Sequence, residues 1–168
     1  MLPGSPAPRP PRLLVAGIGY SNLRDLSAGP ALAERLRSRE WPAGVEVEDL
    51  SLGAVLALHW LQANGPFDAA LFLAAVPRGR EPGSVDRYTW APDALSAEDV
   101  QARVAEAVTG VVSLDNLLAV AGYFRALPAQ VQIIEIEPRD QEWGPDFSPP
   151  VAVAMDAVEA MVQREVRV

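Results

Sequence analysis

Short apolar runs alternate with helix-like segments along the chain, and this alternation constrains the fold more than any other feature. Residues 13–16, 45–48, 69–76 and 131–136 have the length and composition of strands, and 84–90 is a more polar candidate for an edge strand. Strands that alternate with helices form an open, mostly parallel sheet covered on both faces. We therefore expect an α/β three-layer sandwich with a twisted, mostly parallel five-stranded sheet and helices on both faces.

Turn and cap residues predict where the helices lie. Proline at the first helical position loses no useful hydrogen bond, so Pro30 favours a helix start, and Ser96 with Asp99 has the spacing of a capping box. The second helical segment is apolar nearly all round, which predicts a buried helix with a glycine C-cap at Gly65. The expected helices run from Pro30 to before Pro42, from Gly53 to Gln62, from Ser96 to about Val108, from Leu114 to Ala126, and from Ser148 onward.

The length of the chain, 168 residues, suits one domain. Residues 1–11 contain five prolines and are expected to form an extended, poorly ordered tail, which leaves 12–168 as a single α/β domain.

Composition excludes several classes of partner and location. The net charge of -8 would repel a nucleic acid, and no cluster of Lys or Arg offsets it. The chain has no cysteine, which fits a reducing compartment. No apolar run has the length of a signal peptide or a membrane span. We expect a cytoplasmic protein without nucleic-acid or membrane partners.

The turn after the first strand contains two closely spaced glycines, Gly17 and Gly19. In sheets of this kind ligands bind outside the carboxyl ends of the strands, so this turn is a candidate site. A dinucleotide fingerprint needs a third glycine where this chain has Asn22, although Asp49 could contact a ribose. The missing third glycine disfavours a nucleotide site, but this interpretation remains one of two. The other is that the glycines only turn the chain.

From the first strand into the first helix the chain has a spaced set of residues, namely Gly17, Gly19, Leu23, Asp25, Gly29 and Leu36. This set resembles the start of the hydrogenase maturation endopeptidases, and the resemblance extends almost end to end. Its most specific part is Glu137-Pro138 after an apolar strand, followed by Phe147-Ser148-Pro149 and a helix. The resemblance implies an α/β sandwich that binds the large subunit of a nickel-iron hydrogenase and removes its C-terminal extension.

The resemblance also implies three metal ligands, two carboxylates and one histidine. These positions fall on Leu26, on Ala74 or Ala75, and on about Gly110, and none of these residues can bind a metal. We therefore expect no metal, no cofactor and no catalytic residue of the family's type.

Other residues could replace the missing groups. Asp25 is adjacent to Leu26, one of the positions without a ligand, but we favour its interpretation as a turn or cap residue. Asp49 could either face the expected ligand cleft at the carboxyl ends of the strands or cap the next helix. His59, the only histidine, is expected to be packed or at a rim. Glu135 and Glu137 have strand spacing and are interpreted as a solvated face rather than an acid and base pair.

The leading hypothesis is a non-catalytic accessory or chaperone that binds a nickel-iron hydrogenase large subunit or a related metalloenzyme. One alternative is a working endopeptidase that uses other groups, and another is an unrelated small-molecule or nucleotide binder. The candidate residues for partner contact are Asn22, Asp25, Leu26, Asp49, Ser51 and Gly110.

Overall fold

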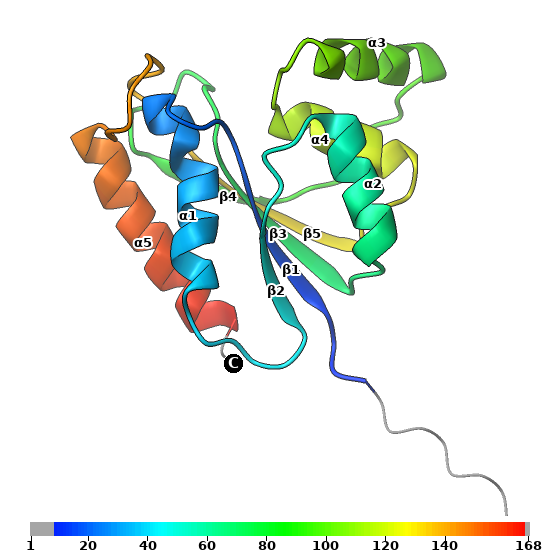
Figure 1. Ribbon diagram of the computed structural model, residues 1–168, viewed down its shortest axis with the longest axis horizontal. Helices are drawn as coiled ribbons and strands as arrows, with labels where there is room; N and C mark the ends of the chain where they lie inside the picture. The colour runs from blue at the N-terminus through cyan, green and yellow to red at the C-terminus, as the bar shows by residue number, and fades with distance from the viewer. Residues whose placement is uncertain (1–8, 167–168) are drawn as a thin grey trace, which may run out of the picture.

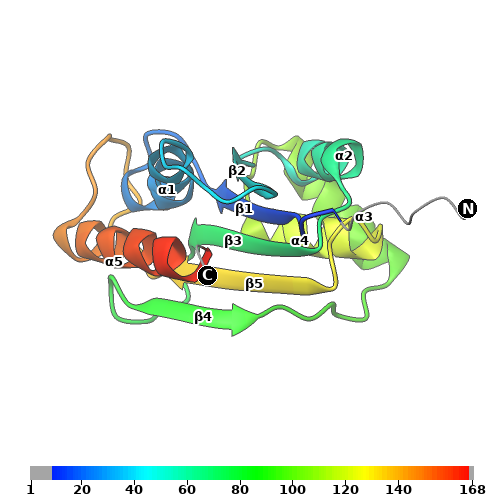
Figure 2. The ribbon, with the colours of Figure 1, turned by 90° about the horizontal axis from the view of Figure 1, so that it is seen from below.

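The computed structural model describes residues 9–166, which form one five-stranded sheet with helices on both faces (Figure 1). The strand order is β2-β1-β3-β5-β4, and only β4 is antiparallel to its neighbour (Figure 2). The strands are β1 (Leu13–Ile18), β2 (Val45–Asp49), β3 (Ala69–Ala75), β4 (Val85–Thr89) and β5 (Gln130–Ile136). The predicted fold class and the edge position of β4 are confirmed.

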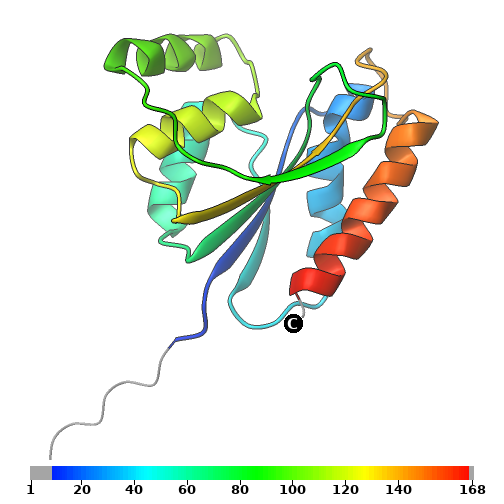
Figure 3. The same cartoon turned by 180° about the vertical axis from the view of Figure 1, so that it is seen from behind.

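Five helices complete the three layers. Helices α1 and α5 pack on one face, α2 and α4 pack on the other, and α3 lies against α4 and α2 farther from the sheet (Figures 1 and 3). The helices are α1 (Ala28–Arg37), α2 (Ala54–Asn64), α3 (Ala97–Val108), α4 (Leu114–Tyr123) and α5 (Pro149–Val166), and a short 3-10 turn, η1 (Arg24–Ser27), precedes α1. Of the predicted tail, only residues 9–11 belong to the described part, and they have no regular secondary structure.

The central strands are buried on both sides because successive side chains point to opposite faces of the sheet. In β3, Phe72 packs with the α2 and α4 layer, whereas Leu71 and Leu73 pack with α1 and α5. A continuous apolar run such as 69–76 therefore predicts such a strand correctly.

Gly17 and Gly29 allow β1 and α1 to cross closely. A Cβ added to Gly17 would collide with the carbonyl oxygen of Gly29, and a Cβ added to Gly29 would collide with that of Ile18. Any side chain at either position would push the helix off the sheet.

Two helices differ from expectation. Helix α2 is not buried all round, since Leu56 is 60% exposed and His59 is also exposed, and its C-cap Gly65 has a φ of -72° rather than a left-handed conformation. Helix α4 ends at Tyr123 rather than Ala126, because Arg125 adopts a left-handed conformation with a φ of 55° that ends the helix.

Within residues 9–166, no helix combines the length and the apolar character that crossing a bilayer requires.

Candidate functional site

The positions that the resemblance assigned to metal ligands lie together at the carboxyl edge of the sheet. Leu26 of η1 and Ala74 of β3 line one hollow of about 200 Å³ between the ends of β1 and β3 and the start of α4. Its other lining residues are Ile18, Gly19, Tyr20, Ala75, Val76, Pro77, Val111, Val112, Ser113 and Leu114. None of these side chains carries a charge, and we call this site the apolar hollow.

The Tyr20 side chain connects the first loop to the segment that follows α3. Its hydroxyl accepts a hydrogen bond of 3.1 Å from the backbone N–H of Val112. Gly110 lies two residues before that contact and has a φ of 85°; it does not line the apolar hollow, although the next residue, Val111, does. The third ligand position is therefore next in sequence to a lining residue of the hollow but outside the hollow itself.

A second, more open depression of about 480 Å³ lies between the start of α2 and the end of α3, and we call it the outer groove. Ser51 and Gly110 line it, together with the exposed side chains of Leu56 and Val108, of which Val108 is 82% exposed. The Ser51 hydroxyl accepts a hydrogen bond of 3.1 Å from the N–H of Gly19, which joins this groove to the first loop.

Asn22 and Asp49 lie on the opposite side of Tyr20. Both line a polar hollow of about 450 Å³ that is bordered by α1 and by the loop before α5. Asp49 Oδ1 accepts a hydrogen bond of 2.9 Å from the N–H of Ser51, so this carboxylate stabilises the turn before α2 while the residue stays exposed. Asp49 thus lines a hollow at the carboxyl edge of the sheet but does not cap α2, because the N-cap residue Gly53 has no side-chain cap hydrogen bond.

Asp25 has no exposed surface and does not reach any of these depressions. Its carboxylate accepts four hydrogen bonds of 2.7 to 2.8 Å, from the backbone N–H groups of Arg139, Asp140 and Ser148 and from the Ser148 hydroxyl. Burial acts to raise the pKa of Asp25, but these hydrogen bonds outweigh it and hold the pKa below the ordinary value. Of the candidates for partner contact, Asp25 is the one whose side chain is unavailable.

Two backbone N–H groups of the glycine turn, those of Gly19 and Tyr20, already have acceptors within the protein. The N–H of Gly19 donates to Ser51, and the N–H of Tyr20 donates to the carbonyl of Leu26 at 3.1 Å. A Cβ on Gly19 would collide with that same carbonyl, so η1 fills the space beside the turn. Because a dinucleotide site needs open N–H groups and room for the pyrophosphate, this geometry disfavours the nucleotide interpretation.

The prediction that Glu135 and Glu137 form a solvated face is wrong. They are 2% and 4% exposed, and Glu135 accepts hydrogen bonds from the guanidinium groups of Arg78 and Arg80 and from the Tyr88 hydroxyl. Glu137 accepts from Arg80 and from the backbone N–H groups of Arg78 and Gly79. Burial acts to raise the pKa of both carboxyls, but these hydrogen bonds lower it below the ordinary value.

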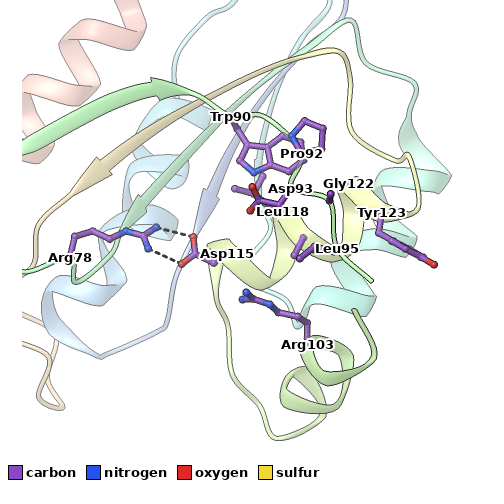
Figure 4. A pocket seen from close by; sticks show the side chains of 12 residues that line it. Arg78, Trp90, Pro92, Asp93, Leu95, Arg103, Asp115, Leu118, Gly122 and Tyr123 are labelled. Atoms are coloured by element: carbon purple, nitrogen blue, oxygen red, sulfur yellow. Dashed lines mark hydrogen bonds and ion pairs between the residues drawn. The ribbon is translucent and has the colours of Figure 1, made fainter. Parts of the chain in front are cut away.

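Sequence reasoning missed a pocket of about 340 Å³ beside this network (Figure 4). On one side Arg78 forms a bidentate ion pair with Asp115, with N–O distances of 2.8 and 2.9 Å. Trp90, Arg103 and Tyr123 are among its other lining residues. The two arginines that follow the third strand were the only available signal, because their carboxylate partners come from distant segments.

The side chains at these positions do not fit the nickel that the resemblance in the sequence implies. In the apolar hollow the relevant side chains are Leu26 and Ala74, which have no lone pairs, and Gly110 has no side chain at all. His59 is exposed on α2, consistent with a rim histidine. Across residues 9–166, no three His, Asp or Glu side chains gather as a metal site requires.

Several solved structures with the same fold are hydrogenase maturation proteases. The hydrogenase 2 maturation peptidase of a Thaumarchaeota archaeon is 25% identical, with a TM-score of 0.64 over 91% of this chain and 96% of its own. HycI from Escherichia coli is 18% identical over 91% of this chain and 90% of its own, with a TM-score of 0.64. HybD from Escherichia coli is 20% identical over 91% of this chain and 93% of its own, with a TM-score of 0.59. No family model and no curated protein matches the sequence.

Over nearly its whole length the chain has the fold of the nickel-iron hydrogenase maturation proteases. This similarity of structure confirms the resemblance seen in the sequence. The chain differs from the pattern that the resemblance implies at the metal-binding positions.

Proposed function

We propose that this chain is a non-catalytic member of the hydrogenase maturation protease class. It binds the large subunit of a nickel-iron hydrogenase, or a related metalloenzyme, as an accessory or chaperone. The cytoplasm, where thiols stay reduced, is its predicted location.

One observation carries this proposal: the positions that the resemblance assigns to the ligands remain together, but the site they form is apolar. Leu26 and Ala74 line one hollow, and Gly110 directly precedes Val111, which lines the same hollow. Hydrocarbon groups cannot recognise a divalent metal, whereas a small apolar hollow can accept an aliphatic side chain of a docked polypeptide. The fold thus supports retention of the docking surface, and the residues in it disfavour nickel-dependent cleavage.

The second candidate function is an endopeptidase that acts on the same precursor through other groups. Asp49 favours this alternative, because its exposed carboxylate lines the polar hollow at the same edge of the sheet. Asp25 cannot contribute, since its carboxylate is buried and its four hydrogen bonds hold it to the loop before α5.

Native mass spectrometry of the chain mixed with a nickel-loaded large-subunit precursor tests the proposal. We expect a complex that contains the uncut precursor, and we expect Leu26→Asp to weaken it by placing a charge in the apolar hollow. His59→Asp is the matched control, because it adds a carboxylate at an exposed position of α2. Absence of a complex with the unmodified chain would contradict the proposal.

A further inference from the structure

The loop between β5 and α5 presents a single large aromatic side chain to solvent. Trp143 is 75% exposed, although tryptophan is usually largely buried. The loop lies beyond the carboxyl end of the strands, next to the start of α1 (Figure 1), and so on the same edge as the candidate site. We call residues 139–148 the Trp143 loop.

Backbone contacts fix the chain on both sides of Trp143. Gly144 pairs with the first loop in both directions, since its N–H donates to Asn22 at 2.8 Å and its carbonyl accepts from Arg24 at 3.0 Å. On the other side, the N–H of Glu142 donates to the Asp140 carboxylate at 2.9 Å. The Arg24 guanidinium holds that carboxylate in an ion pair of 3.1 Å.

The buried carboxylate of Asp25 anchors the two ends of the same loop. It accepts from the N–H groups of Arg139 and Asp140 at one end and from Ser148 at the other. The loop is thus ordered before any partner arrives, and binding through Trp143 loses little conformational entropy. Buried tryptophans dominate the binding energy of many interfaces, so a rigid, exposed Trp143 has the properties of an interface anchor.

The surroundings of Trp143 are acidic and continuous with the candidate site. Glu142 and Asp146 are exposed in the loop itself, and Pro145 lines the polar hollow that also contains Glu34 and Asp49. The exposed Arg37 also lines that hollow and Arg139 is exposed in the loop, so these four carboxylates outnumber two guanidinium groups. A partner that covers it must therefore supply an apolar socket for the indole and basic side chains around that socket.

We propose that the Trp143 loop is a docking element that inserts Trp143 into an apolar socket, ringed by Lys or Arg, on the hydrogenase large subunit. This inference rests on the proposed function and assigns it a contact outside the apolar hollow. Recognition then uses two sites on one edge of the sheet, the Trp143 loop and the apolar hollow. The acidic surroundings of the loop accelerate encounter with the basic partner surface.

The affinity of the chain for a large-subunit precursor, measured by biolayer interferometry, tests this inference. We expect Trp143→Ala to weaken binding by about 30-fold, the loss typical of an interface hot spot. Phe124→Ala is the matched control, because Phe124 is a 50% exposed aromatic after α4, near the opposite edge of the sheet, and we expect a change below about twofold. Both variants should unfold at the temperature of the unmodified chain, since neither side chain is in the core.

The charge complementarity has its own readout in the same experiment. Affinity of the unmodified chain should fall as salt rises from about 0.05 to about 0.3 M, and the double variant Glu142→Lys, Asp146→Lys should bind more weakly with a smaller salt dependence. Equal affinity of the unmodified chain and Trp143→Ala would overturn the docking role while leaving the proposed function intact. No binding by the unmodified chain would overturn both.

Discussion

The carboxylate of Asp25 accepts hydrogen bonds of 2.7 Å from both the backbone N–H and the hydroxyl of Ser148, 123 positions later in the chain. This contact joins the turn after β1 to the start of α5, so the first loop and the Trp143 loop form one unit. Leu26, the next residue after Asp25, is held at the apolar hollow by the same contact.

Ser148→Ala should lower the free energy of unfolding by about 1.5–3 kcal/mol, the range for a hydrogen bond to a charged group. The backbone N–H of Ser148 still donates to Asp25 in this variant, so the fold should persist. Urea denaturation measures the change. The control is Ser38→Ala, which removes an exposed hydroxyl bonded to the carbonyl of Arg35 and should change stability by less than about 0.5 kcal/mol. Equal losses in the two variants would contradict the role assigned to Ser148.

Stability should fall in acid because three buried carboxyls, those of Asp25, Glu135 and Glu137, have pKa values held below their ordinary values of 3.8, 4.5 and 4.5. The unfolded chain then takes up protons at a higher pH than the folded chain, so stability is fully present above the ordinary pKa values and is lost as pH falls through the folded values. Urea midpoints measured at decreasing pH below about 4.5 should therefore decrease.

Asp25→Asn isolates the contribution of one carboxyl to this acid sensitivity. The variant lacks the charged acceptor of the Asp25 hydrogen bonds, so its free energy of unfolding should be lower at neutral pH. Because position 25 can no longer titrate, the variant's stability should fall less steeply in acid than that of the unmodified chain. The same acid slope in both proteins would show that Asp25 does not have a lowered pKa.

Gly17→Ala should destabilise the chain by about 3 kcal/mol or more, because its methyl group would collide with the backbone of α1 at Gly29. Gly53→Ala is the matched control, since a Cβ at Gly53 would meet no atom closer than 3.5 Å, and its loss should stay below about 1 kcal/mol. Thermal unfolding of both variants makes the comparison. A loss of stability below about 1 kcal/mol in Gly17→Ala would mean that the packing of α1 on the sheet does not depend on its close approach to β1.

Replacing Leu26 and Ala74, the two apolar residues at ligand positions in the apolar hollow, by carboxylates should create affinity for nickel. The double variant Leu26→Glu, Ala74→Asp places two oxygen ligands in one hollow, and calorimetry should detect Ni²⁺ binding that the unmodified chain lacks. The control variant Leu56→Glu, Val108→Asp places the same groups at the open outer groove, where they should not bind nickel tightly. Equal affinity of both variants would argue against convergence of Leu26 and Ala74.

Local signals predicted most of the fold. The β3 strand follows from its apolar run, and the capping box of Ser96 and Asp99 forms as expected at the start of α3. These features depend on residues within a few positions of one another, which is the range over which sequence patterns are informative.

The errors concern side chains whose partners are distant in sequence. Strand spacing gave no sign that Glu135 is buried, because Arg78 stands 57 positions earlier and compensates its charge. Its neighbours in sequence likewise predict Asp25 to be a local turn or cap residue, but all four hydrogen bonds that its carboxylate accepts come from residues more than a hundred positions away. Only the sheet topology brings such groups together.

The central claim is that this chain binds a hydrogenase large-subunit precursor without cutting it. The intact mass of a nickel-loaded precursor, followed over time after mixing with an excess of this chain, tests it most directly. We predict an unchanged precursor mass together with a complex of the two proteins. A precursor that loses its C-terminal extension would contradict the claim and establish an endopeptidase that works without the ligands at Leu26, Ala74 and Gly110.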